Sequence, residues 1–361
     1  MVTVSLCMVV RDEAHVLARC LDSVRDLTDE IVIVDTGSRD NTREVAQRYT
    51  ARVPDFPWID DFSAARNFSF TQATGDYIFW LDADDILLEE DRIRFRSMCE
   101  TLDPSVDIVM LPHHIAFDAE GKPIETVRRE RLIRREAGLR WEGVVRERIV
   151  PCGKVIDGDS AVTHLRMRPR DPNRDLRILE RQLARGRRLT PREQYVYGRE
   201  LRDHGRFGEA IDCLRQLLDE GHGDAEDCIA ACQVQADCYD HLGLPDMALR
   251  ALLRSMTFDM PRAEICCALG ARFVEKGECA QAAFWYETAL RCPCPTGGYC
   301  SPECRGFLPY VRLCMCYRQM GDDQTAEKYL RKARKMRPHD EAVRYYGAYF
   351  RAVRAKQKKQ S

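Results

Sequence analysis

The sequence predicts an α/β domain followed by an all-α domain of helical repeats. The chain has 361 residues, which is more than one hydrophobic core usually serves, so we expect two domains. In the first half, short apolar runs rich in β-branched residues alternate with segments of helical periodicity, the pattern of a mostly parallel sheet. The second half lacks such runs and repeats a short motif about every 34 residues. We expect the two domains to cover residues 1–168 and 169–361.

Composition and charge narrow the class of protein further. The chain is 45% hydrophobic and 32% charged, and its formal net charge is -2, which gives no global electrostatic reason to bind nucleic acid or a membrane surface. The first residues lack a basic leader and a small-residue cleavage site, and no stretch approaches the roughly 20 apolar residues of a membrane span. We therefore expect a cytoplasmic protein without a transmembrane segment or a nucleic-acid partner.

Four strands and two helices are expected in the first domain. The strands are the apolar runs TVSLCMVV, EIVIVD, DYIFWLD and DIVMLPHH. The helices are DEAHVLARCLDSVRDL and SRDNTREVAQRYT, and the second has Ser38 or Asp40 as its N-cap. Ligands of such sheets bind at the carboxyl ends of the strands. Arg11, Asp35 and the acidic run that begins at Asp82 all fall at those ends, so we expect the site there.

The second domain contains four copies of a Gly followed five residues later by an Ala. The copies are GRFGEA, GLPDMA, GECAQA and GDDQTA, and their spacings are 38, 34 and 44 residues. The middle spacing equals the tetratricopeptide period, in which the Gly turns the chain between two helices and the Ala allows close packing. We expect repeats near residues 191–221, 225–260, 261–292 and 305–338.

The long last spacing indicates an insertion, CPCPTGGYCSPEC, that carries four of the seventeen cysteines. These four have enough ligands for a zinc ion, although their spacing is not that of a common zinc knuckle, and the alternative is free thiols in a loop. They are Cys292, Cys294, Cys300 and Cys304. Without a secretion signal, we expect the other cysteines to be reduced.

Four motifs together resemble the family 2 glycosyltransferases with the GT-A fold, a Rossmann-like fold, over most of residues 3–165. The motifs are SLCMVVRDEAHVLARCLDSV, IVIVDTGSRDNT, DDFSAARNFSFTQATGDYIFWLDADD and LRWEGVVRERI. With the appended repeats, the layout is similar to bacterial glycosyltransferases with tetratricopeptide tails, such as the sublancin-type peptide S-glycosyltransferases, and to lipopolysaccharide core glucosyltransferases. The resemblance implies an inverting sugar transfer from a nucleotide diphosphate sugar, UDP-linked, with Mn²⁺ or Mg²⁺ as the cofactor.

The resemblance also implies a donor site at the strand ends. Asp35 would accept a hydrogen bond from uracil, or else cap its own turn. Arg66 and Asn67 would form a donor-site pair, unless Arg66 pairs locally with Asp60 or Asp61. The residues expected to bind the nucleotide sugar are Val10, Arg11, Glu13, Asp35, Gly37, Arg66, Asn67, Asp82 and Ala83.

The acidic run resembles the DxD motif of the family. Asp84 would ligate the cation directly, Asp82 would face the ribose or the water shell of the cation, and His164 would be a late third ligand. Asp85 is open between a site role and an N-cap of the next helix. The expected base is Glu147 or, in competition with it, Glu142; either could instead pair with nearby arginines.

Two departures from the family pattern leave an alternative open. Relatives often carry NE where this chain has Arg11 to Glu13, and a His where it has Arg146. The alternative is therefore a catalytically inactive scaffold. At least one of His113 and His114 is expected to face the acceptor cleft.

The repeats would bind the acceptor or form a homodimer. Because repeat arrays present concave surfaces, a peptide or protein acceptor is favoured over a lipid, and a glycan acceptor stays open.

Overall fold

The structure is a computed structural model that divides the chain into two compact units. The units are Met1–Arg188 and Leu189–Ser361. The boundary that we expected at residue 168 falls in a segment outside the residues that the structure describes. The described residues are 2–118, 120–165, 171–293 and 301–360.

Helix α5 (Arg174–Ala184) belongs to the first unit, so the division falls 20 residues after the expected one. The reason is a set of polar contacts with Asp60, which is buried. Arg181 and Arg185 form ion pairs with the Asp60 carboxylate at 3.2 and 3.0 Å. Gln182 donates a hydrogen bond to the Asp60 carbonyl at 2.9 Å.

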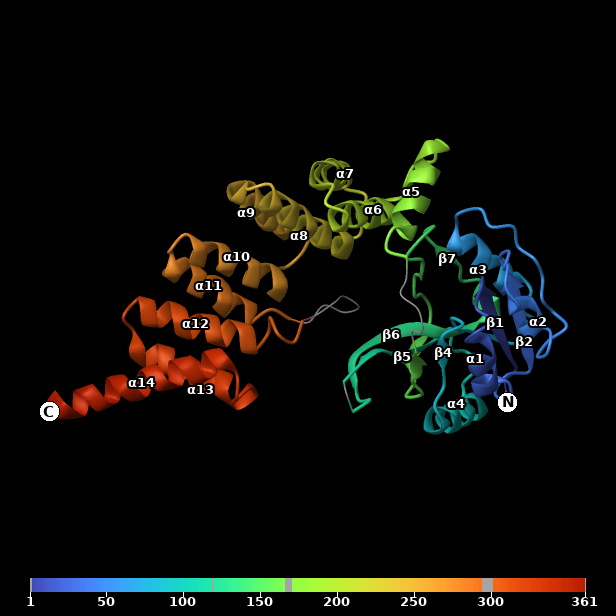
Figure 1. Cartoon of the computed structure of the whole chain (residues 1–361), viewed down its shortest axis with the longest axis horizontal. Coiled ribbons are helices and arrows are strands. Elements are labelled where there is room, and N and C mark those ends of the chain that lie inside the picture. Colours follow the sequence, from blue (N-terminus) through green and yellow to red (C-terminus); the bar gives the residue numbers. More distant parts are fainter. Residues whose placement is uncertain (1, 119, 166–170, 294–300, 361) are drawn as a thin grey trace. The chain divides into compact units, whose positions relative to one another are not determined.

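The first unit is built on one mixed sheet. Its strands are β1 (Val4–Val10), β2 (Glu30–Asp35), β3 (Tyr77–Trp80), β4 (Asp85–Ile86), β5 (Ile108–Phe117), β6 (Pro123–Arg134), β9 (Val155–Asp157) and β10 (Val162–His164) (Figure 1). Their order is β2-β1-β3-β6-β5-β10-β4, with β9 also paired to β5. The strands β7 (Trp141–Glu142) and β8 (Arg148–Ile149) form a separate antiparallel pair.

The predicted α/β class is confirmed, but the sheet is less parallel than we expected. Strand β1 is parallel to β2 and β3, and β5 is parallel to β9 and β10. Strand β6 runs antiparallel to both β3 and β5, and β4 runs antiparallel to β10. Strand β6 was not predicted because its first half is exposed and charged, and only a short stretch near Leu132 and Ile133 is buried.

Helices cover both faces of the sheet because successive side chains of a strand point to opposite faces. On β1, the alternate residues Val4, Leu6 and Met8 pack in one core with the helices α1, α2 and α4. On the other face, Cys7 packs with α3 and with Trp141 of β7. These helices are α1 (Leu17–Val24), α2 (Thr42–Ala46), α3 (Phe62–Thr71) and α4 (Glu89–Thr101). A short 3-10 helix spans Arg135–Ala137.

The N-cap that we expected for α2 is wrong. The helix begins at Thr42 with Asn41 in the N-cap position. Ser38 and Asp40 lie before it and bind the loop that follows β1 instead: Asp12 N donates to Ser38 Oγ at 3.0 Å, and Ala14 N donates to Asp40 Oδ2 at 3.1 Å.

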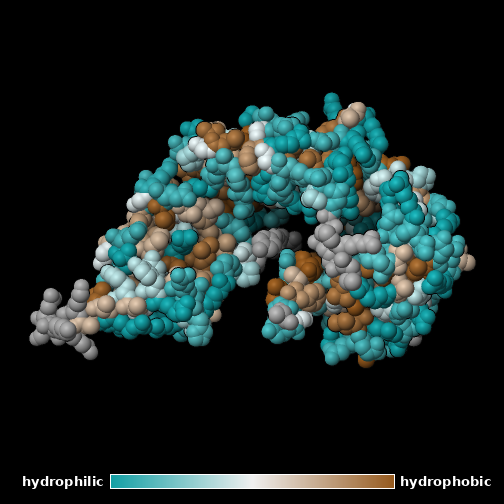
Figure 2. Space-filling view, viewed as in Figure 1, coloured by the Kyte–Doolittle hydropathy of each residue, from teal (hydrophilic) through white to brown (hydrophobic). Residues whose placement is uncertain are grey.

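The second unit is a series of helix pairs, one in each range expected for a repeat. The pairs are α6 (Pro191–Asp203) with α7 (Phe207–Glu220), α8 (Ala225–His241) with α9 (Pro245–Arg254), α10 (Ala263–Glu275) with α11 (Cys279–Ala289), and α12 (Phe307–Gln319) with α13 (Asp323–Met336). A 3-10 turn spans Ser255–Thr257, and α14 (Glu341–Gln360) follows the last pair. The face of these helices seen in Figure 2 is mostly hydrophilic, with hydrophobic side chains in small patches.

The Gly and Ala of the repeated motif do what the spacing predicted. The four glycines have positive φ angles, between 71° and 84°, so they end the first helix of each pair in a conformation that favours glycine. The four alanines are fully buried between the helices. The glycines are Gly205, Gly243, Gly277 and Gly321, and the alanines are Ala210, Ala248, Ala282 and Ala326.

The first two helix pairs are also joined by ion pairs between residues that lie 35 positions apart. Arg192 pairs with Asp227, Arg202 with Asp237 at 3.1 Å, and Arg254 with Asp219 at 2.7 Å. Because this separation is close to one repeat, each pair connects the same position of adjacent repeats. No helix within the described residues is both long enough and apolar enough to cross a membrane.

Candidate active site

The loops after β1 and β2 are held together by hydrogen bonds at the carboxyl edge of the sheet. Arg39 N donates to Asp12 Oδ1 at 2.7 Å, and Glu13 N donates to Thr42 Oγ1 at 2.7 Å. Asp12 has a φ of 57°, which the bonds to its backbone and carboxylate maintain. Arg11, next to it, is exposed and lies 4.0 Å from the Asp12 carboxylate.

Asp35 ends β2 and is buried at this edge. Its Oδ1 accepts hydrogen bonds from Gly37 N at 3.2 Å, Ser38 N at 3.0 Å and Ser38 Oγ at 2.7 Å. Oδ1 of Asp35 therefore caps the turn that follows β2, which is the alternative role that we considered for this residue. Gly37 has a φ of 96°, and the carbonyl of buried Val10 accepts Thr36 N at 3.0 Å.

Arg66 of α3 connects two carboxylates that are far apart in the sequence. Its Nη2 donates to Asp82 Oδ1 at 2.8 Å, and its Nε donates to Glu147 Oε1 at 2.7 Å. The guanidinium also stacks over Trp80 and Trp141, at 5.1 and 4.8 Å from the ring centroids. Burial alone would lower the pKa of Arg66, but the two carboxylates outweigh it and hold the pKa above its ordinary value. The alternative that we considered, a local pairing of Arg66 with Asp60 or Asp61, is therefore wrong.

Asp60 and Asp61 are occupied elsewhere. Asp60 pairs with α5, and Asp61 is the N-cap of α3, where its Oδ1 accepts Ala64 N at 2.9 Å. Asn67 also has a backbone partner: its Nδ2 donates to the Trp141 carbonyl at 3.0 Å, and its Oδ1 accepts Trp141 N at 2.9 Å. The Asn67 amide thus clamps β7 onto α3.

The DxD residues lie just after β3, with Ala83 buried between them. The Asp82 side chain is 41% exposed, and the burial cost to its charge is outweighed by Arg66, so its pKa is lowered. Asp84 is 29% exposed, and its Oδ1 lies 3.4 Å from His164 Nδ1. Burial, reinforced by the charges of Asp82 and Asp85, raises the pKa of Asp84. Three carboxylates therefore crowd one strand end, with His164 beside them.

Asp85 is not the helix N-cap that we left open. It begins β4, where it pairs with His164 of β10, and α4 starts only at Glu89 after the N-cap position Leu88. The register turns the Asp85 side chain into the protein, where it is 0% exposed.

A buried polar network surrounds the Asp85 carboxylate. Its Oδ1 lies 3.1 Å from both His113 Nε2 and His164 Nδ1. Its Oδ2 lies 3.0 Å from Arg131 Nη1, and Arg131 is also 0% exposed. Burial opposes ionisation of Asp85, but Arg131 and the two imidazoles outweigh it, so its pKa is well below the ordinary range. The ligand atoms of Asp85, His113 and His164 lie within 4.8 Å of one another.

The pKa values of the two imidazoles are shifted in opposite directions. Burial lowers the pKa of His113, whereas the hydrogen bond to Asp85 raises the pKa of His164. His114, the next residue of β5, points elsewhere and lies 2.7 Å from Thr126 Oγ1 of β6.

The two candidate bases lie on the β7–β8 hairpin. Glu147 is 13% exposed and bound to Arg66, whereas Glu142 is exposed. Because Trp141 packs against Arg66, the neighbouring Glu142 points to the opposite side of β7. Arg146, which stands where relatives often have a His, has a φ of 50° and pairs with Asp175 of α5 at 3.0 Å.

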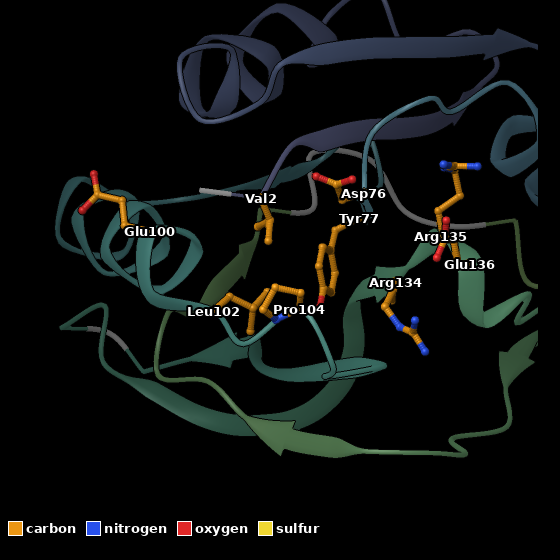
Figure 3. Close-up of a pocket in the computed structure, with 9 residues that line it drawn as sticks. All are labelled: Val2, Asp76, Tyr77, Glu100, Leu102, Pro104, Arg134, Arg135 and Glu136. Carbon is orange, nitrogen blue, oxygen red and sulfur yellow. The ribbon is translucent and has the colours of Figure 1, made fainter.

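A pocket of about 360 Å³ lies at the other edge of the sheet, where β1 and β3 begin and β6 ends (Figure 3). Three of its charged residues already have partners. Asp76 accepts Thr3 N at 2.8 Å, Arg134 pairs with Asp107, and Arg135 donates to the Gly75 carbonyl at 2.8 Å. None of the predicted site residues lines it, so the chemistry points to the carboxyl edge.

Comparison with known proteins identifies the family of each half of the chain. Residues 5–153 match the model of glycosyl transferase family 2, and residues 309–346 match a tetratricopeptide repeat. A TPR repeat-containing protein of Synechococcus elongatus is 30% identical over 356 residues, which cover 97% of this chain and 70% of that protein. The SPbeta prophage-derived glycosyltransferase SunS of Bacillus subtilis is 26% identical over 237 residues, or 60% of this chain and 53% of SunS.

Further matches are shorter. An uncharacterized glycosyltransferase of Rickettsia conorii is 30% identical over 87 residues, which are 24% of this chain and 30% of that protein. The alignment with SunS likewise spans only about half of SunS. The family match covers β1 to β8 and ends before β9, β10 and His164, and the repeat match covers most of the last helix pair. This chain therefore belongs to the family 2 glycosyltransferases that carry tetratricopeptide repeats after the transferase domain.

Proposed function

We propose that the first unit transfers a sugar from a UDP-sugar to a peptide or protein acceptor, with inversion and with a divalent cation. One observation carries the proposal: Asp82, Asp84 and His164 gather at the carboxyl edge of the sheet beside the Arg66–Glu147 pair. This edge is where open α/β sheets bind ligands. The repeats support a peptide or protein acceptor, because such arrays bind extended chains.

Asp84 and His164 are the residues that would hold the cation. They fit it because a carboxylate oxygen and an imidazole nitrogen lie 3.4 Å apart, and both groups suit Mn²⁺. The raised pKa of Asp84, caused by burial and by its acidic neighbours, indicates a carboxylate that lacks positive charge. A cation bound there would offset the charge that develops on the diphosphate leaving group. We assign Asp82 Oδ2 to the ribose or to the water shell, because Arg66 binds Oδ1.

The nucleotide would be oriented by the loops after β1 and β2. Asp35 uses Oδ1 for its own turn, so we assign Oδ2 to the uracil ring. The backbone of Val10, Arg11 and Gly37 would shape the base pocket, and Glu13 fixes one loop to the other through its amide. Asn67 would act indirectly, by holding Trp141 where it stacks on Arg66.

We assign the base role to Glu147 rather than to Glu142. Arg66 binds Glu147 Oε1 and so fixes the carboxylate next to the acidic cluster, which leaves Oε2 to take the proton of the acceptor. Glu142 lies on the opposite side of β7 from Trp141.

Two measurements test the proposal. Mn²⁺ with UDP should raise the melting temperature of the wild-type chain, and Asp84→Asn should lose most of that rise; an equal rise in the variant would contradict the metal assignment. With an active donor found from a panel of sugar nucleotides, Glu147→Gln should lower kcat about 10²- to 10⁴-fold while the UDP-dependent shift remains. Glu142→Gln is the matched control and should stay near wild type.

The same panel tests the second candidate function. Arg146, in place of the usual His, is bound to Asp175, which is consistent with an inactive scaffold. No turnover of any sugar nucleotide, with or without peptides, would favour the scaffold over the enzyme.

A further inference from the structure

Two cysteines at the start of α10 each lie against a cysteine that borders the insertion between the third and fourth repeats. The first pair is Cys266 and Cys292, whose sulfur atoms are 3.9 Å apart. Both are buried. Cys292 follows α11 and is the first residue of the insertion, and it lies 26 positions from Cys266.

The second pair is Cys267 and Cys304. The Cys267 thiol donates to the Cys304 carbonyl at 3.4 Å, which places its sulfur beside Cys304. Cys304 is the last cysteine of the insertion, lies just before α12, and is half-buried rather than buried. Two successive residues of one helix thus reach both ends of one inserted segment.

The arrangement is one of pairs rather than of a four-sulfur centre. A zinc site of four thiolates needs all four sulfurs around one ion at about 2.3 Å. Among the described residues, the three-ligand group with atoms close enough to share a metal ion is Asp85, His113 and His164, and no cysteine belongs to such a group. Cys294 and Cys300 lie outside the described residues, so the zinc ligand set expected from the sequence is placed here only in part.

We propose that Cys266 with Cys292 and Cys267 with Cys304 are two dithiol sites that hydroperoxides oxidise to disulfides, which tie α10 to both ends of the insertion. The sulfurs of the first pair are 3.9 Å apart, and the Cys267 sulfur lies 3.4 Å from the Cys304 carbonyl oxygen, so rotation of the side chains can bring each pair toward the bonded distance of about 2.05 Å. The site is independent of the proposed sugar transfer.

Cys304 reacts first. The hydrogen bond from the Cys267 thiol lowers the pKa of Cys304 to about 7, so a large fraction is thiolate at neutral pH, and its partial exposure admits the oxidant. Its sulfur attacks a peroxide oxygen; the S–O bond forms, the O–O bond breaks, and the leaving oxygen takes a proton to become water or an alcohol.

The second step closes the disulfide. The Cys267 sulfur attacks the sulfenic sulfur of Cys304, the S–O bond breaks, and the oxygen leaves as water with the thiol proton. Two electrons pass from the two sulfurs to one hydroperoxide. The hydrogen bond from Cys266 also lowers the pKa of Cys292, and this pair reacts in the same way but more slowly because both of its thiols are buried.

Hydrogen peroxide and peptide mapping test the proposal on the full-length chain. After limited oxidation and blocking of the remaining thiols, mass spectrometry should find the Cys267–Cys304 link first and the Cys266–Cys292 link later. A thiol reductant should reverse both. The same links should form in the Cys294→Ser/Cys300→Ser chain, because neither residue takes part.

Matched variants separate the two sites. Cys267→Ser should abolish the first link and leave the second, whereas Cys314→Ser, which removes a buried thiol of α12 outside both pairs, should leave both unchanged. Three results would overturn the proposal: stoichiometric zinc in the purified chain, links mainly to Cys294 or Cys300, or over-oxidised Cys304 without a disulfide.

Discussion

Asp85→Asn should destabilise the first unit strongly, although Asn and Asp side chains have nearly the same size. In the native protein the Asp85 carboxylate faces Arg131 at 3.0 Å, and neither side chain is exposed. The substitution leaves the guanidinium buried without a counter-charge. Removal of one partner of such a pair costs about 3–5 kcal/mol, and the low end applies because the Asn oxygen still accepts a hydrogen bond.

The expected loss is therefore about 3 kcal/mol of the free energy of unfolding. For a unit of this size, each kcal/mol shifts the melting temperature by roughly 2–4 °C, so the variant should melt about 6–12 °C lower. Tryptophan fluorescence reports on this unit, because Trp58, Trp80 and Trp141 lie in it and only Trp285 lies in the other. A chelator keeps metal ions out of the comparison.

The pH dependence of stability should also show the contribution of the ionised Asp85. The folded-state pKa of Asp85 is well below its ordinary value, so its contribution is fully present above the unfolded-state pKa of about 4 and is lost as the pH falls through the folded-state pKa. The difference in free energy of unfolding between wild type and Asp85→Asn should therefore persist at neutral pH and disappear in acid.

The neighbouring Asp84→Asn is the control for the Asp85 variant. Asp84 has a raised pKa and adjacent acidic groups, so the loss of its charge should leave the melting temperature unchanged or raise it. An Asp85→Asn chain that melts within 2 °C of wild type, at pH 7 and without metal, would refute the reasoning from the buried Arg131.

Two further predictions concern a pH dependence and the repeats. The pKa of His164 is raised, so its contribution to stability is present below about pH 6.5 and is lost as the pH rises through the folded-state pKa. The free energy of unfolding of the metal-free wild type should therefore exceed that of His164→Gln by less above pH 6.5. A difference that stays constant from pH 5 to 9 would contradict this. Gly270→Ala should lower the free energy of unfolding by about 1–3 kcal/mol because a Cβ there would lie 2.8 Å from the ring of Tyr286. The control Gly208→Ala, whose Cβ would meet nothing within 4 Å, should be neutral or stabilising. Equal melting temperatures for the two variants would argue against tight packing at Gly270.

Local patterns predicted the parts of the fold that depend on local chemistry. The strand EIVIVD coincides with β2, and the Gly and Ala spacing predicted the turns and buried positions of the repeats. These features follow from side-chain periodicity and backbone freedom, which a short segment reveals. Strand β6 was missed because its exposed, charged half carries no strand-like apolar alternation, and its pairing with β3 and β5 is a long-range contact.

Only some of the residues at the centre of the candidate site could be predicted from the sequence. Asp82, Asp84 and His164 follow strand ends, so their meeting could be inferred from topology. Asp85 looked like a helix cap because the next helix begins shortly after it, and only the pairing of β4 with β10 turns it inward. Arg131 carried no usable signal, since an arginine in a charged segment gives no sign that it will be fully buried.

The ion pairs that join residues 35 positions apart bear on the evolution of the second unit. Each couples a guanidinium of one of the first two repeats to a carboxylate of the other, as Arg202 does with Asp237. Half-exposed pairs of this kind add little stability, but they discriminate between partners. A duplicated, deleted or exchanged repeat would set some of these charges against the wrong neighbour. At the junction of the first two repeats, these charges therefore favour the native neighbours over a shuffled arrangement.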